Sequence, residues 1–211
     1  MNGRLADGRD RSAGESVSRP VRDQLFIPED LIIATWRALA PTAAKRVEGT
    51  VRWAAPAVLS RGGPRIVTTV LVPRQVVGPG RFELPPEATR MMGDTLLEHG
   101  LVNVAQVHTH PDRLVGHSPW DDERAYSHRD GALSIVWPCY GEAVPRMDSW
   151  GVHTCTGGRW RRLTRAEVAA HVAIVPSVLD LRISVTMFST PDEDDQRSGA
   201  GARGGSSHAC S

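Results

Sequence analysis

Histidines, a serine and several carboxylates lie close together between Val107 and Glu123, in the stretch VHTHPDRLVGHSPWDDE. His108 and His110 end an apolar run, LVNVAQV, which predicts a buried β-strand. Alternate residues of a strand point to the same side, so both imidazoles face one pocket. Imidazole nitrogen is a preferred zinc ligand, and catalytic zinc sites take three protein ligands and a water. Asp121 is the candidate for the third ligand.

The same residues also have a purely structural interpretation. Ser118, Pro119 and Asp121 fit the N-cap, first position and first-turn acid of a helix. The two histidines on one strand face equally fit imidazoles that are hydrogen-bonded in a core. The interpretations are compatible, because a helix that starts just after a strand can aim an acid inward and hold it rigidly.

Other metal chemistries lack the residues they need. An H-E-x-x-H helix is absent, and the stretch PCYGEA lacks the second cysteine of a zinc deaminase. A barrel hydrolase needs roughly 250 residues. We expect His117 and His128 to be solvated or to lie outside the ligand set, since three ligands suffice. His208 and Cys210, in the C-terminal tail, are too few ligands for a metal site.

The elements around this stretch predict a mixed α/β sheet with helices packed on it. Tryptophans 53, 137, 150 and 160 are expected to be packed in the core. The expected helices are 27–40, 85–100, a short one within 118–129, and 164–175, which ends before Pro176. The expected strands are a hairpin of 49–60 with 65–77, then 101–110, 131–140 and a pair of edge strands within 149–163.

Length and composition restrict the class of protein. The 211 residues predict one domain, 24–189, between Gly-, Ser- and charge-rich tails, 1–23 and 190–211, that we expect to be disordered. A net charge of +1 gives no reason to expect a nucleic-acid partner. No apolar run approaches the ~20 residues that span a bilayer, and no signal peptide is visible. Three cysteines without a C-x-x-C pair favour the cytoplasm.

The stretch HTHPDRLVGHSPWD resembles the signature of the JAMM metalloproteases, the catalytically active branch of the JAB/MPN family. That signature is His-x-His-Pro followed by Ser-x-x-Asp, and here seven residues, Pro111 to His117, precede the serine. The resemblance implies an MPN/JAB-like mixed sheet with flanking helices, in a cytidine-deaminase-like layered architecture. It also implies a zinc ion (Zn2+) held by His108, His110 and Asp121.

The resemblance implies two catalytic residues as well. Ser118 matches a serine that steadies the oxyanion, where one added donor can contribute a few kcal/mol. Glu48, in KRVEGTVRW, follows the first helix as the family's general base does. The glycines that usually follow that base are missing here, so Glu83 remains the alternative base.

The resemblance further implies hydrolysis of a peptide or isopeptide bond at the C-terminal tail of a ubiquitin-like protein. The small size is similar to the bacterial branch, whose members work with activating- and conjugating-enzyme homologues or process sulfur-carrier proteins. A non-catalytic MPN-type interaction module is the alternative, although such modules usually lack the ligand set.

Overall fold

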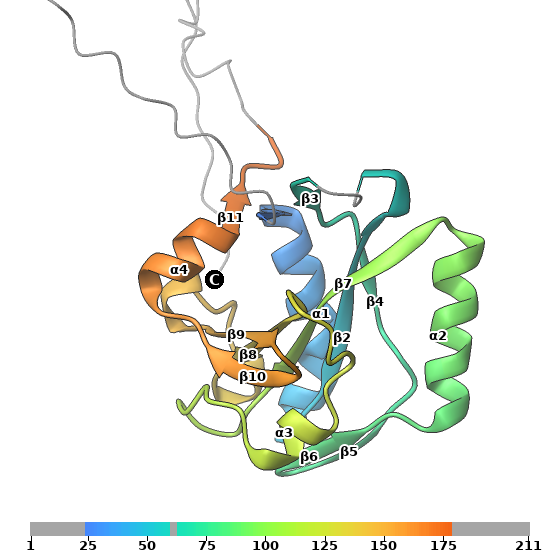
Figure 1. Cartoon of the computed structure of the whole chain (residues 1–211). Coiled ribbons are helices and arrows are strands. Elements are labelled where there is room, and N and C mark those ends of the chain that lie inside the picture. Colours follow the sequence, from blue (N-terminus) through green and yellow to red (C-terminus); the bar gives the residue numbers. More distant parts are fainter. Residues whose placement is uncertain (1–23, 60–62, 179–211) are drawn as a thin grey trace, which may run out of the picture. The chain divides into compact units, whose positions relative to one another are not determined.

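A six-stranded mixed sheet forms the framework of the computed structural model, which describes residues 24–59 and 63–178 (Figure 1). In spatial order the strands are β10 (Arg159–Arg162), β9 (Gly151–Thr156), β8 (Leu133–Trp137), β7 (Leu101–Thr109), β2 (Thr50–Pro56) and β4 (Thr69–Leu71). Strands β8 and β7 are parallel, and the other neighbouring pairs are antiparallel. The predicted mixed sheet with flanking helices is confirmed. Both predicted tails, and residues 179–189, lie outside the described residues.

A second, smaller sheet was not predicted. It consists of β1 (Leu25–Pro28), β3 (Arg65–Ile66) and β11 (Val172–Val175), all parallel. The expected helix over 164–175 therefore stops early: α4 spans Arg165–His171, and the β-branched residues that follow pair with β1. The expected hairpin is confirmed in part. Strand β4 pairs antiparallel with β2, but β3, at the start of the expected second strand, pairs with β1.

Helix α1 (Glu29–Ala44) is fixed to the large sheet through one buried face. Leu31, Thr35 and Leu39 are four residues apart and buried, as one face of a helix requires. The indole Nε1 of Trp53 on β2 donates to Thr35 Oγ1 at 2.8 Å. This hydrogen bond connects the helix to the strand that follows it in the chain.

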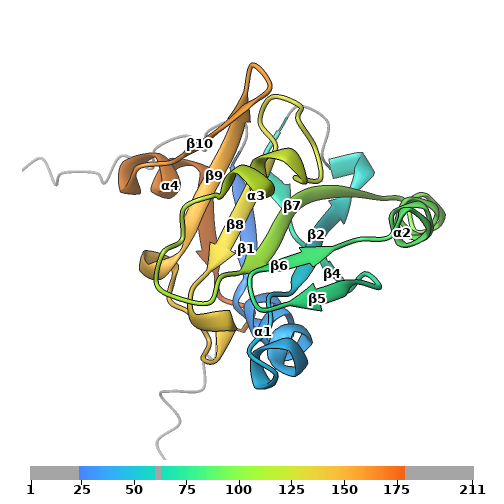
Figure 2. The same ribbon diagram turned by 90° about the horizontal axis from the view of Figure 1, so that it is seen from below.

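The remaining elements lie around the edges. Helix α2 (Pro86–Glu98) stands at one side of the domain, while α4 and β10 lie at the other (Figures 1 and 2). A short ribbon, β5 (Val76–Gly78) and β6 (Arg81–Glu83), lies below the large sheet in Figure 1, beside α3 (Pro119–Glu123).

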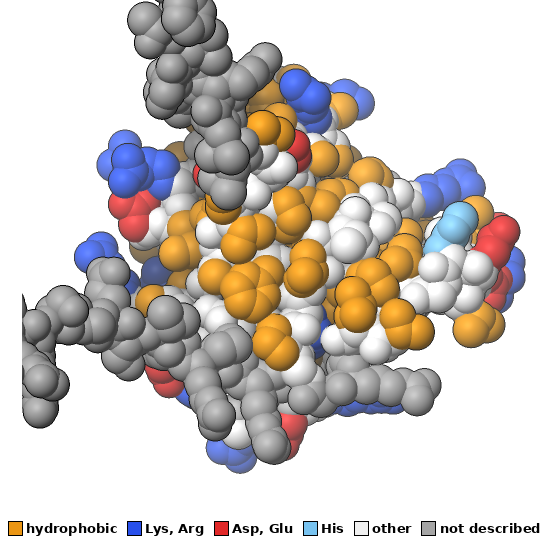
Figure 3. Space-filling model, turned by 90° about the horizontal axis from the view of Figure 1, so that it is seen from above, with side chains coloured by type: hydrophobic (Ala, Val, Ile, Leu, Met, Phe, Trp, Pro, Cys, Tyr) orange, Lys and Arg blue, Asp and Glu red, His pale blue; other side chains and the backbone are white. Residues whose placement is uncertain are grey.

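The core contains three of the four tryptophans that the sequence predicts there. The rings of Trp53 and Trp150 are 6.2 Å apart and those of Trp137 and Trp150 are 5.9 Å apart, all three being buried. Trp160 is only partly buried. Hydrophobic side chains also gather on the outer face that carries β3 and β11 (Figure 3). Among the described residues, no helix is long and apolar enough to cross a membrane.

Candidate metal centre

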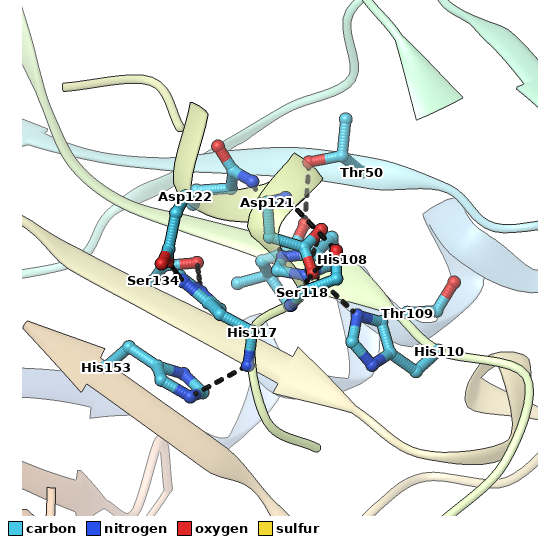
Figure 4. A network of polar contacts seen from close by, with 12 residues as sticks. Thr50, His108, Thr109, His110, His117, Ser118, Asp121, Asp122, Ser134 and His153 are labelled. Carbon is cyan, nitrogen blue, oxygen red and sulfur yellow. Dashed lines mark hydrogen bonds and ion pairs between the residues drawn. The ribbon is translucent and has the colours of Figure 1, made fainter. Parts of the chain in front are cut away.

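Three side chains meet at the carboxyl end of β7. In the parallel β7–β8 pair, His108 lies opposite Val136, and the strand ends one residue later. His108 Nε2 lies 3.4 Å from Asp121 Oδ1, and His110 Nε2 lies 3.3 Å from Asp121 Oδ2 (Figure 4). One ligand atom from each residue fits within 4.8 Å of the other two. The structure thus brings the three predicted ligands together.

The start of α3 aims Asp121 at the histidines. The N–H and the hydroxyl of Ser118 both donate to Asp121 Oδ2 at 2.7 Å, and the N–H of Asp121 donates back to Ser118 Oγ at 3.2 Å. This reciprocal capping box fixes the carboxylate on the first turn of the helix. The capping interpretation is therefore confirmed, and the cap orients the candidate ligand. Its predicted contact with an oxyanion stays a prediction.

The loop between β7 and α3 is held from two sides. His110 Nδ1 donates to the carbonyl of Leu114 at 2.9 Å, which leaves Nε2 turned toward Asp121. On the other side, the carbonyl of Val115 lies against Gly151 of β9. A Cβ added at Gly151 would be 1.8 Å from that oxygen, so only glycine lets the loop approach the strand.

Glu48 lies just before β2. Its carboxyl group is buried, with 5% of the residue exposed, and interacts electrostatically with His110 and Asp121. Its N–H donates to the carbonyl of Gly78 on β5 at 2.9 Å. Gly49 packs so closely on Thr42 of α1 that an added Cβ would be 2.6 Å from the threonine hydroxyl.

Contacts on both sides therefore fix the position of Glu48. The alternative base, Glu83, is exposed on β6.

A second polar cluster adjoins the histidines and was not predicted. His117 stacks on His153 of β9 with ring centroids 3.9 Å apart. Its Nδ1 lies 2.8 Å from Asp122 Oδ1 and its Nε2 2.9 Å from Ser134 Oγ on β8 (Figure 4). His117 is thus tied to two strands and to α3, rather than solvated. His153 and Ser134 gave no sequence signal, because strand pairing alone brings them beside the motif.

His128 is exposed, with its Nε2 2.9 Å from the carbonyl of Asp122.

Burial controls the charge state of the site. Desolvation lowers the pKa of His108 to about 4, so its imidazole is neutral at pH 7. Burial raises the pKa of Asp121, but the neighbouring imidazoles of His108 and His110 outweigh it and hold that pKa well below its usual range. Burial also raises the pKa of Glu48 to about 7, against the attraction of His110. A neutral imidazole beside a carboxylate is the state in which these groups bind a metal.

No family model matches the sequence, and no curated protein matches it. Among solved structures, protein DSY2949 from Desulfitobacterium hafniense matches with a TM-score of 0.52 at 12% identity, over 74% of this chain and 95% of that one. A protein from Salinibacter ruber matches with a TM-score of 0.45 at 16% identity, over 65% of this chain and 88% of that one. AF2198, a JAB1/MPN domain protein from Archaeoglobus fulgidus, matches with a TM-score of 0.40 at 14% identity, over 72% of this chain and 97% of that one. The likeness to DSY2949 concerns the fold alone.

Proposed function

We propose that this protein is a zinc-dependent hydrolase that cleaves a peptide or isopeptide bond. The observation that carries the proposal is the convergence of His108, His110 and Asp121 within 4.8 Å. Two imidazoles and one carboxylate are a ligand set of catalytic zinc, which leaves a fourth position open. The spacing of these residues, which resembles the JAMM signature, supports the same assignment.

The residues present fit such an ion. His108 Nε2 is buried and has no hydrogen-bond partner among the described residues. An unpaired buried nitrogen is costly, and a metal on its lone pair removes that cost. In this assignment His108, His110 and Asp121 hold the zinc, while Ser118 and Leu114 orient two of them. When bound, zinc supplies Lewis-acid polarisation and lowers the pKa of a coordinated water.

Glu48 is the residue that moves a proton in this proposal. In the metal-free protein burial raises the pKa of the Glu48 carboxyl group to about 7, and in this proposal the group accepts a proton and returns it to a leaving nitrogen. Gly78 and Gly49 fix the backbone on either side of it, so the carboxyl group needs little rearrangement. Ser118 is the further donor to the developing oxyanion.

The proposed substrate is the C-terminal tail of a ubiquitin-like or sulfur-carrier protein, with activating- or conjugating-enzyme homologues as further partners. An extended tail can add to a sheet edge by main-chain hydrogen bonds. Strand β6 offers such an edge, since its one strand partner among the described elements is β5. It also lies beside the site, because the ring of Phe82 is 5.6 Å from that of His108.

The test combines metal content and cleavage. The full chain is incubated with a fusion that carries an extension after a ubiquitin-like tail, with and without chelator. We expect roughly one zinc per chain and cleavage that the chelator abolishes. His108→Ala is expected to lose both, whereas the matched variant His128→Ala keeps both.

Glu48→Gln and Glu83→Gln identify the base. We expect the first to retain zinc while cleavage falls by roughly 100-fold or more, and the second to cleave normally. Zinc absent even after soaking points instead to a non-catalytic interaction module, and cleavage that survives chelation rejects the mechanism.

A further inference from the structure

A buried arginine without an acidic partner lies on the same sheet face as the metal centre. Thr50 of β2 pairs with His108, and Arg52 pairs with Gln106, two residues farther along both strands. Residues two apart on a strand face the same side, so Arg52 and His108 share a face. Arg52 is 2% exposed, and no carboxylate of the described residues forms an ion pair with it.

The guanidinium has one edge free of acceptors. Its Nη1 donates to Thr50 Oγ1 at 2.7 Å and to the carbonyl of Val51 at 3.3 Å. Nε is buried without a partner, and no acceptor among the described residues binds Nη2. The Nε–Nη2 edge is a fork that matches the two oxygens of a carboxylate. The ring of Tyr126, 5.7 Å away, faces the cation but supplies no negative charge that would pair with it.

This arginine lines a pocket of about 520 Å³. Phe82, Leu84, Pro86 and Met92 supply an apolar wall, and Asn103 adds an amide whose buried Oδ1 has no hydrogen-bond partner. Phe82 separates this pocket from the metal centre, since its ring also contacts that of His108. An apolar cavity with a few convergent polar groups is the usual form of a small-molecule subsite.

Burial of an unpaired cation is expensive, and desolvation lowers the pKa of Arg52 to about 10. Replacing a buried ionic group by an apolar one is often neutral or stabilising, so stability alone gives little reason for an arginine here. A ligand carboxylate removes the cost by pairing with the guanidinium.

We propose that Arg52 and Asn103 form a subsite for the carboxylate of an acylated amino acid or peptide with an apolar side chain. The carboxylate binds the free edge of Arg52, the adjacent amide N–H donates to Asn103 Oδ1, and the apolar side chain packs on the wall beside Phe82. The subsite is independent of zinc and does not rest on the proposed hydrolysis.

Binding of four probes to the full chain tests this proposal, with zinc bound and after chelation. N-acetyl-leucine is expected to bind at least ten-fold more tightly than N-acetyl-leucinamide or inorganic phosphate, and equally well in both metal states. An acetylated glutamate amide distinguishes a side-chain carboxylate from a C-terminal one. Equal binding of acid and amide, or of phosphate, overturns the proposal, as does binding that disappears with the metal.

Arg52→Met provides the second measurement. We expect it to weaken N-acetyl-leucine binding at least ten-fold while its melting temperature stays equal to that of the wild type or rises. The exposed Arg165→Met, on α4, is the matched control and binds normally. Unchanged affinity in Arg52→Met overturns the assignment. If that variant fails to fold, the comparison of acid with amide on the wild-type chain still decides.

Discussion

At the scale of single residues, neighbouring buried groups of the site have different charge states at pH 7. His108 and Asp121 are both buried, yet the imidazole is neutral at pH 7 because desolvation lowers its pKa, and the carboxylate is ionised because the neighbouring imidazoles outweigh its own desolvation. Glu48 lacks a comparable donor, so desolvation dominates and its pKa rises to about 7. These environments give the proposed metal ligand and the proposed proton carrier different charge states, although both are acidic residues in the sequence.

The raised pKa of Glu48 predicts a pH-dependent stability in the metal-free protein. Between the ordinary pKa of 4.5 and about 7, the folded state keeps a proton that the unfolded state has released. Stability therefore falls as pH rises through that window. Glu48→Gln removes this loss, so at pH 8 the variant is expected to be more stable than the wild type by about 2 kcal/mol.

Chemical denaturation of both proteins at pH 4.5 and pH 8 measures this effect. The advantage of Glu48→Gln should nearly vanish at the lower pH, where the folded state is protonated and the unfolded state is half protonated. Glu83→Gln, on exposed β6, controls for the loss of one carboxylate. An advantage of Glu48→Gln that is the same at both pH values contradicts the raised pKa.

At the scale of elements, a strand end and one short helix contain the whole candidate ligand set. Fourteen residues, His108 to Asp121, include all three candidate ligands, which is why their spacing along the chain and its resemblance to the JAMM signature could predict them. Periodicity gave the histidines a common face, and capping chemistry placed Ser118 beside Asp121. Glu48 comes from another part of the chain, so its place was inferred from chain order rather than from spacing.

The cap on α3 is expected to contribute to zinc affinity as well as to stability. Ser118→Ala removes a cap worth about 1 kcal/mol and both hydrogen bonds of the hydroxyl, one donated to the Asp121 carboxylate and one accepted from the Asp121 N–H. The backbone N–H of residue 118 still donates to the carboxylate. Zinc affinity should fall by roughly ten-fold or more, as when the supporting partner of a ligand is lost.

Thr164→Ala is the matched variant, because Thr164 and Glu167 form the same capping box on α4. We expect a similar loss of stability with unchanged zinc affinity. Competition with a chromophoric chelator measures affinity, and equal zinc affinities of the two variants would show that the cap does not position the ligand.

Gly151 is expected to control the loop that precedes α3. Gly151→Ala puts a methyl group where the Val115 carbonyl now lies, so the loop must move and carry His110 and Asp121 apart. Zinc affinity should fall by about ten-fold or more even though no ligand changes. Gly116→Ala lies in the same loop, has no atom within 4 Å of its added Cβ, and should bind zinc normally. Identical zinc titrations for the two variants count against this packing argument.

At the scale of the whole molecule, the elements that the sequence did not predict depend on pairing between strands that are distant in the chain. The segments that became helices α1 and α2 and strands β2 and β7 were visible as local patterns. The strands β1 and β11 were not, because four residues carry too little periodicity and their pairing joins the two ends of the domain. His153 and Ser134 escaped notice for the same reason, since only the register of β8 with β9 brings them together.

The hydrogen bond between Trp53 and Thr35 connects α1 to the sheet and predicts a measurable coupling. Thr35→Val leaves the buried indole N–H unsatisfied, which costs about 1–3 kcal/mol. Trp53→Phe removes the donor and part of the core. The double variant should lose less stability than the sum of the two single losses, by roughly 1 kcal/mol. Urea denaturation of the three variants measures this difference. Full additivity means that the bond contributes nothing to stability.

The pairing of β1 with β11 has a practical consequence for rearranging the chain. The strands are parallel and four residues long, so Leu25 and Val175 lie roughly 11 Å apart, given the usual strand rise and spacing. A linker of a few residues can join them, and new termini can open at the exposed turn of Gly157 and Gly158. A circular permutant of this kind retains every pairing of both sheets except the tip of one hairpin.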